Sequence, residues 1–463
     1  MAESKPPSKA RFLLMLALAA AVPILLLLLV SYLQGRATGR RFGARLEAIR
    51  KAGEPVTMEE LAATCPEPPP GRNAADAYQR AFREMEARCD FALEKDLPVV
   101  GIADFPELGA AVPPEVLEKA RAYLDRHQET FRLLAAAAAL DECRFDLDFS
   151  LGYEMPLDHV SKMRQATRLL SLCALERTES GKGEEAAAAS RIILRLARAL
   201  GQEPFLISTL VRTGLDAIAF RTIERWASRA CPLPPTLARV EAALRDESDP
   251  KMLGRPLLAE RCMFLDAAEK GFGAELTKHG TLAHRLGVER GALADLLKMV
   301  PFPYRCTDAE QLYFLDYVAG YLEAARKPYP ESLIVGAALR WKPAPERYLA
   351  VTAVAPGFDS FFSAVQWHMA RIESARMALA VLRYRVASKK LPDALGDLAP
   401  GFVASVPLDP YDGKPLRYRK EADGFVVYSV SKNGVDDAGV IETKKGSDPP
   451  DVGFRVRWPK GHF

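Results

Sequence analysis

Residues 358–390 read FDSFFSAVQWHMARIESARMALAVLRYRVASKK, and this stretch predicts one long helix. Its apolar residues recur every three or four positions: Phe362, Val365, Met369, Ile372, Ala375, Leu379, Leu382 and Val386. This spacing places them in one continuous stripe along a helix of roughly thirty residues. The positive charge at 388–390 suits the end of that helix, because the C-terminus of the helix dipole is negative.

Three short strands are predicted after this helix. Leu416–Tyr418, Phe425–Val430 and Phe454–Trp458 are rich in aromatic and β-branched residues and are separated by turn residues. The region 358–463 is therefore expected to form a small α+β domain, with the long helix beside an antiparallel three-stranded sheet.

Two motifs in this region are more specific. Residues 409–418 follow the pattern D-P-x-x-G-K-P-x-x-Y, and residues 428–437 read YSVSKNGVDD. In this order after a long helix, they make residues 360–458 resemble the C-terminal domain of the major pseudopilins of type II secretion. In that family the loop after the Y-S strand binds calcium. By position, the resemblance implies a calcium site with side chains from Asn433, Asp436 and Asp437 and with the carbonyls of Val430 and Val435.

The chain also departs from the family. Pseudopilins begin with a processed glycine and carry a glutamate in the first turn of the membrane helix, and this chain has neither. More than three hundred residues separate its apolar N-terminal run from the resembling region. The alternative interpretation of the loop is a simple turn at Asn433-Gly434, with both aspartates solvated.

The N-terminal run, Phe12–Leu33, reads FLLMLALAAAVPILLLLLVSYL and contains no charge. Its 22 residues would span roughly 33 Å as a helix, enough for the hydrocarbon core of a bilayer. The basic residues of 5–11 also fit a cleaved signal peptide, but the run is too long and no A-x-A-like site follows it. We therefore expect a single-pass transmembrane anchor that is not removed.

The orientation of this anchor has two interpretations. More basic residues follow the run, at 36–45, than precede it, which favours a cytoplasmic body. A short N-terminal tail before a large domain is, however, the form of a signal anchor with an exported body. We predict a cell-membrane protein with its body on the exported side.

The remaining chain predicts a mainly α fold. Helices at about 159–177 and 184–200, joined by a glycine turn, and a third helix after them suggest antiparallel helical hairpins. One alternating segment, Arg144–Leu151, predicts a short extended stretch. The expected organisation is a tail (1–11), an anchor (12–33), a juxtamembrane helix and linker (34–72), an all-α domain (73–326), a proline-rich connection (327–357) and the α+β domain (358–463).

Composition narrows the functional classes. The net charge of +3 gives no basic footprint for nucleic acid. Seven cysteines occur without a C-x-x-C pair, which predicts buried thiols and neither a disulfide framework nor a zinc site.

Our main hypothesis is a non-enzymatic, membrane-anchored interaction or assembly protein with an unknown protein partner and a pseudopilin-like, calcium-stabilised C-terminal domain. The alternative is a membrane-bound, metal-dependent hydrolase. The sequence contains no familiar catalytic motif, but one cluster combines carboxylates with an imidazole suited to metal binding or acid–base chemistry. Its members are Asp146, Asp148, Asp158 and His159.

Overall fold

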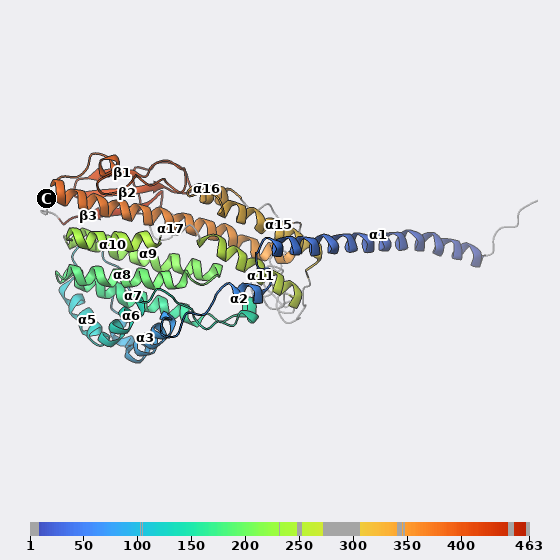
Figure 1. Cartoon of the computed structure of the whole chain (residues 1–463), viewed down its shortest axis with the longest axis horizontal. Coiled ribbons are helices and arrows are strands. Elements are labelled where there is room, and N and C mark those ends of the chain that lie inside the picture. The colour runs from blue at the N-terminus through green and yellow to red at the C-terminus, as the bar shows by residue number, and fades with distance from the viewer. Residues whose placement is uncertain are drawn as a thin grey trace, which may run out of the picture.

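The computed structural model describes residues 9–101, 103, 105–230, 232–247, 252–271, 306–339, 345, 348–442 and 449–459, with the backbone alone for 9–20. The protein is mainly helical and has one small antiparallel sheet near the C-terminus, as the sequence predicts. In Figure 1 helix α1 (Lys9–Lys51) projects from one end of an elongated body, and the sheet lies toward the other end.

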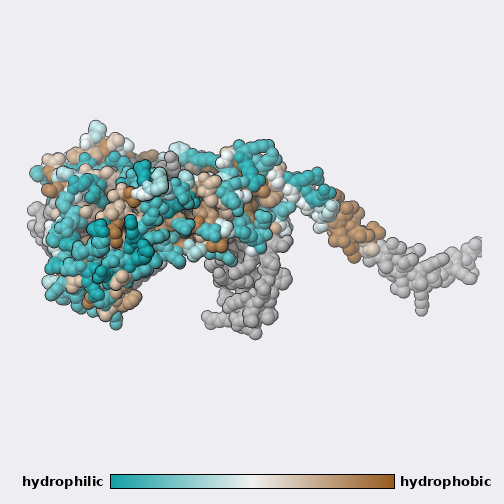
Figure 2. All heavy atoms as spheres, turned by 60° about the horizontal axis from the view of Figure 1, so that its bottom comes forward, coloured by the Kyte–Doolittle hydropathy of each residue, from teal (hydrophilic) through white to brown (hydrophobic). Residues whose placement is uncertain are grey.

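Helix α1 runs without a break through the predicted anchor and into the body. Its apolar part is not buried against the protein: Leu27, for example, is 69% exposed. Figure 2 shows this stretch as a continuous hydrophobic band, whereas the body surface is mostly hydrophilic. The helix is therefore long and apolar enough to cross a membrane, and Pro23 lies inside it.

The second part of α1 docks on helix α15 (Asp308–Ala325). Gly39 permits this close approach, since an added Cβ would lie 2.8 Å from the Oδ2 atom of Asp308. A small apolar cluster completes the contact and consists of Phe42, Leu46, Ile49, Val56, Leu265 and Leu315. The body is thus fixed to the helix that carries the apolar run.

Antiparallel helices form the layers of the body. α7 (Asp158–Glu179), α8 (Gly183–Leu200) and α9 (Leu206–Arg229) pack on one another, and the predicted hairpin turn contains Gly181 at φ +74°. The indole N–H of Trp226 donates to the Gly183 carbonyl at 2.9 Å and ties α9 to the start of α8. The other helices of this part are α2 (Met58–Ala63), α3 (Ala74–Arg88), α4 (Phe91–Glu94), α5 (Pro114–Asp125), α6 (Gln128–Ala138), α10 (Pro234–Glu247) and α11 (Gly254–Lys270).

The alternating segment Arg144–Leu151 does not form a strand. Residues 144–148 are irregular, and the 3-10 helix η1 (Phe149–Glu154) follows them. Phe145 and Phe149 are buried, so the alternation reflects which side chains reach the core and not the pairing of a strand.

The long C-terminal helix is α17 (Leu349–Ser388), which begins nine residues before the predicted start at Phe358 and contains Pro356. The early start depends on a tertiary contact. The buried Glu310 carboxylate accepts the backbone N–H groups of Ala350 (2.9 Å) and Val351 (3.2 Å), which have no partner inside the helix. Helix α16 (Glu331–Ala338) lies between α15 and α17 along the chain, within the predicted connection.

The sheet has the order β1-β2-β3, with β1 (Arg417–Glu421), β2 (Gly424–Val430) and β3 (Asp451–Arg457). The three strands lie close to their predicted positions. Every residue of the central strand β2 is buried, because the sheet packs on α17, and β3 also contacts α9.

Polar contacts join the sheet to the helical body. The Glu224 carboxylate of α9 accepts the backbone N–H of Arg455 and a guanidinium N–H of Arg371, each at 3.1 Å. The N–H of Arg457 donates to the Ser228 hydroxyl at 3.1 Å. One hydrophobic core continues from the helices into the sheet, so the regions 73–326 and 358–463 pack as a single body.

Candidate functional site

The densest network of carboxylates lies where the loop 407–416 meets the end of β2. Asp409 is fully buried and anchors this loop, which turns at Gly413 with φ +72°. Its carboxylate accepts hydrogen bonds from the N–H of Tyr411 (2.8 Å), the hydroxyl of Ser429 (2.7 Å) and the N–H of Val430 (2.9 Å). Burial raises the pKa of Asp409, and these donors oppose that rise.

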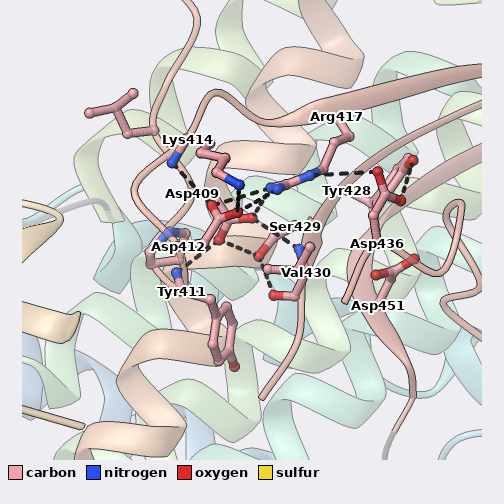
Figure 3. A network of polar contacts seen from close by, with 12 residues as sticks. Asp409, Tyr411, Asp412, Lys414, Arg417, Tyr428, Ser429, Val430, Asp436 and Asp451 are labelled. Carbon is pink, nitrogen blue, oxygen red and sulfur yellow. Dashed lines mark hydrogen bonds and ion pairs between the residues drawn. The ribbon is translucent and has the colours of Figure 1, made fainter. Parts of the chain in front are cut away.

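Arg417 is the central cation of this network, and Lys414 lies 3.9 Å from Asp412 at its edge (Figure 3). Its Nη1 lies 2.5 Å from Oδ2 of Asp409, and its Nη2 lies 2.5 Å from Oδ2 of Asp412. Its Nε lies 3.8 Å from Oδ2 of Asp436, on the loop after β2. One guanidinium thus bridges three aspartates from two loops, and it is only 17% exposed.

The predicted calcium ligands have other partners. The side chain of Asn433 donates to Oδ2 of Asp437 at 2.7 Å, and its Oδ1 accepts the N–H of Val435. Oδ1 of Asp436 accepts the Tyr428 hydroxyl at 3.0 Å, while its Oδ2 faces Arg417. Asn433 and Asp437 are therefore paired with each other, and Asp436 contacts Tyr428 and Arg417 instead.

Asp451 is a member of this loop that the sequence analysis missed. It is fully buried at the start of β3, and its carboxylate accepts the N–H groups of Gly439 (2.8 Å) and Asp437 (3.4 Å). Gly439 has φ +76°, so the loop bends back over the strand at a position that favours glycine.

In this structure Asp436 pairs with Tyr428 and Arg417, whereas Asn433 pairs with Asp437, so the three side chains do not meet at one point. Calcium needs six to eight oxygens that converge on one point. Across the described residues, no group of three or more His, Cys, Asp or Glu side chains could hold a metal ion. Arg417 supplies positive charge to Asp409, Asp412 and Asp436.

The structure also separates the predicted acid–imidazole cluster. Asp146, Asp148 and Asp158 are exposed, and Asp148 accepts the N–H and the hydroxyl of Ser150. His159 is buried, and its Nε2 lies 2.6 Å from Oε1 of Glu203.

The surroundings of His159 are those of a core residue. Its ring stacks on Phe145 at a centroid distance of 4.2 Å. The Ser208 hydroxyl donates to the other oxygen of Glu203. The Glu203 carboxylate therefore lies between the His159 imidazole and the Ser208 hydroxyl. A serine nucleophile needs the reverse order, with the histidine next to the hydroxyl. No local sequence signal marks Glu203 as the partner of His159.

A hollow of about 430 Å³ lies among α3, α4, α5 and α7. Phe91 stands at its edge and is 81% exposed, which is unusual for a large aromatic side chain. The other lining residues are Met85, Glu86, Cys89, Glu94, Val100, Tyr123, Gln165, Arg168 and Leu169.

Glu94 determines the chemistry of this hollow. Its Oε1 accepts the Cys89 thiol at 2.8 Å and the Tyr123 hydroxyl at 2.7 Å. Burial, together with the hydrogen bond to Glu94, raises the pKa of Cys89 to about 11. The thiol is therefore protonated at neutral pH and is a weak nucleophile.

Comparison of the chain with models of known protein families, with curated proteins and with solved structures found no match.

Proposed function

We propose that this protein is a non-enzymatic, membrane-anchored interaction or assembly protein. In this proposal α1 crosses the membrane once and the body presents a docking surface to a protein partner. The apolar, exposed first part of α1 supports the anchor, because so many exposed leucines are costly in water. The docking of α1 on α15 supports a body held in a fixed position above the bilayer.

The observation that carries the proposal is the exposed Phe91 beside its hollow. A partner's apolar side chain that entered the hollow would bury this ring and the apolar wall formed by Met85, Val100 and Leu169. Aromatic residues in such positions commonly dominate the energy of protein interfaces. The protonated Cys89 favours binding over covalent chemistry at this site.

The test begins with a photoreactive benzoylphenylalanine at position 91, in cells that make the full chain. Leu233, 63% exposed in the turn before α10, is the matched control position. We expect a protein crosslink from position 91 and none from position 233. The crosslinked protein is then purified, and its affinity for the full chain is measured.

Phe91→Ser should weaken this affinity by about thirtyfold, the equivalent of roughly 2 kcal/mol, because it removes an interface aromatic. Leu233→Ser should leave the affinity unchanged. Equal crosslinking from both positions, or an affinity that Phe91→Ser does not change, would contradict the proposed surface.

We also propose that the body lies on the exported side of the cell membrane. The basic residues Lys5, Lys9 and Arg11 before the apolar run support this orientation, whereas the arginines after the run oppose it. A C-terminal tag should be accessible to antibody on cells whose outer layers are removed and whose plasma membrane is intact. Accessibility only after permeabilisation would place the body in the cytoplasm.

A fold relationship to the pseudopilin C-terminal domain is the last part of the proposal. The order of α17 and the three antiparallel strands supports it. The use of Arg417 in place of a bound cation would then be a departure of this chain from that family.

A further inference from the structure

Three exposed arginines follow the apolar part of α1 directly: Arg36, Arg40 and Arg41. Within the described part of the chain, none of them has an ion-pair partner. The Arg36 guanidinium lies over the Tyr32 ring, 5.8 Å from its centroid, at the end of the apolar run. These three residues, here termed the arginine collar, are a concentration of positive charge for which the described residues provide no ion-pair partner.

The remaining basic residues of the described α1 side chains behave differently. Arg45 lies 3.4 Å from Asp316, Arg50 lies 2.8 Å from Glu60, and Lys51 lies 2.8 Å from Glu47. Among the described residues, pairing therefore begins at Arg45, beyond the arginine collar. Arg36 precedes the docking contact at Gly39, and Arg40 and Arg41 directly follow it.

Helix geometry sets the height of the arginine collar. At 1.5 Å per residue, Arg36 lies about 4–5 Å beyond Leu33, and Arg41 lies about 12 Å beyond it. The polar headgroup layer of a leaflet is roughly 5–8 Å thick. Long arginine side chains can extend back toward that layer, so all three guanidinium groups can reach headgroup phosphates.

The local charge balance favours an anionic ligand. Among the described residues, the Asp308 carboxylate lies against the helix at Gly39 and places one negative charge beside the three positive charges of the collar. Guanidinium groups bind phosphate oxygens through paired hydrogen bonds. Because the docked helix is continuous, the collar stays at a fixed height relative to the apolar run.

We propose that the arginine collar binds the phosphate groups of anionic phospholipids in the leaflet on the body's side. This inference rests on the proposed membrane anchor. The ligand is a lipid headgroup at the bilayer surface, and free phosphate is the competing source of the same chemistry.

The experiment uses the full chain in phosphatidylcholine vesicles that contain a minority of phosphatidylglycerol. Spin-labelled versions of both lipids report their relative association with the protein. We expect a preference for phosphatidylglycerol of at least about fivefold, which corresponds to one arginine–headgroup contact. Arg36→Gln/Arg40→Gln/Arg41→Gln should reduce this preference to near one.

The matched control is Arg45→Gln/Arg50→Gln/Lys51→Gln, which removes the same charge from the same helix at paired positions. This variant should keep the preference. An equal loss in both variants, or a preference that the collar variant retains, would overturn the proposal. Loss of the preference on addition of millimolar inorganic phosphate at constant ionic strength would identify a general anion site and would also overturn it.

Flotation of the vesicles in a density gradient reports the anchor separately. Protein that floats without a lipid preference would refute the lipid site alone. Protein that does not float would refute the anchor and, with it, this inference.

Discussion

Two buried carboxyl groups, Asp409 beside the sheet and Glu260 in α11, differ in their neighbours. Asp409 has four donors, one of which is the Arg417 guanidinium. Glu260 accepts one hydrogen bond, from the Tyr153 hydroxyl at 2.6 Å, and burial raises its pKa to about 7. Burial disfavours the charged form in both, so the donors decide how strongly each group resists ionisation.

The comparison also separates two roles for buried charge. At Asp409, one cation, two backbone N–H groups and one hydroxyl hold two loops on the sheet. At Glu260, burial with a hydrogen bond from Tyr153 raises the pKa to about 7, so we expect the stability of the packing around α11 to depend on pH near neutrality. The first arrangement specifies a structure, and the second makes its stability depend on conditions.

The largest effect on the free energy of unfolding is expected when the Arg417 guanidinium is removed from Asp409. Arg417→Met leaves Asp409 buried without its guanidinium and should lower the free energy of unfolding by about 3–5 kcal/mol. Urea unfolding of the full chain in detergent measures this change. Arg419→Met removes a 45% exposed cation from Glu421 on the same strand. Because Arg455 still pairs with that carboxylate, the change should cost no more than about 1 kcal/mol. Equal effects of the two substitutions would show that the network around Asp409 is not important for stability.

A smaller effect on the free energy of unfolding, and a stabilising one, is expected when Glu260 is replaced. Its folded pKa of about 7 exceeds the ordinary value of 4.5 for this group, so its stabilising contribution is complete below pH 4.5 and is lost as the pH rises through 7. Glu260→Gln should therefore raise the free energy of unfolding at pH 8 by about 2–3 kcal/mol and have little effect near pH 4.

Unfolding of the wild type and of Glu260→Gln across this pH range gives the measurement. Tyr153→Phe is the companion variant, because it removes the one donor and should destabilise the protein by about 1 kcal/mol. A pH dependence that Glu260→Gln leaves unchanged would place the neutral-pH transition at another group.

The smallest expected effect on stability is that of added calcium. Because Arg417 pairs with Asp436 and Asn433 donates to Asp437, calcium or a chelator should leave the melting temperature of the full chain unchanged. A bound ion at a hundred times its Kd would add about 2.7 kcal/mol of stability. A calcium-dependent rise that Asp436→Ala/Asp437→Ala abolishes would instead establish the site that the pseudopilin resemblance implies.

Much of the fold was predictable because the relevant patterns are local. The apolar run of α1, the stripe of α17 and the three strands follow from residue types at regular spacing. The candidate sites were less predictable. The sequence pointed to Asn433, Asp436 and Asp437, and it did not single out Asp412, Arg417 or Asp451.

The sequence by itself determined the apolar helix, the helical hairpins and the positions of the three strands, since hydrophobic periodicity acts over a few residues at a time. Only the tertiary structure decided where α17 begins, which cation the aspartates share and which partner His159 has. Glu310, Arg417 and Glu203 each act through contacts with residues on other segments of the chain. Such contacts depend on packing, and no local pattern encodes them.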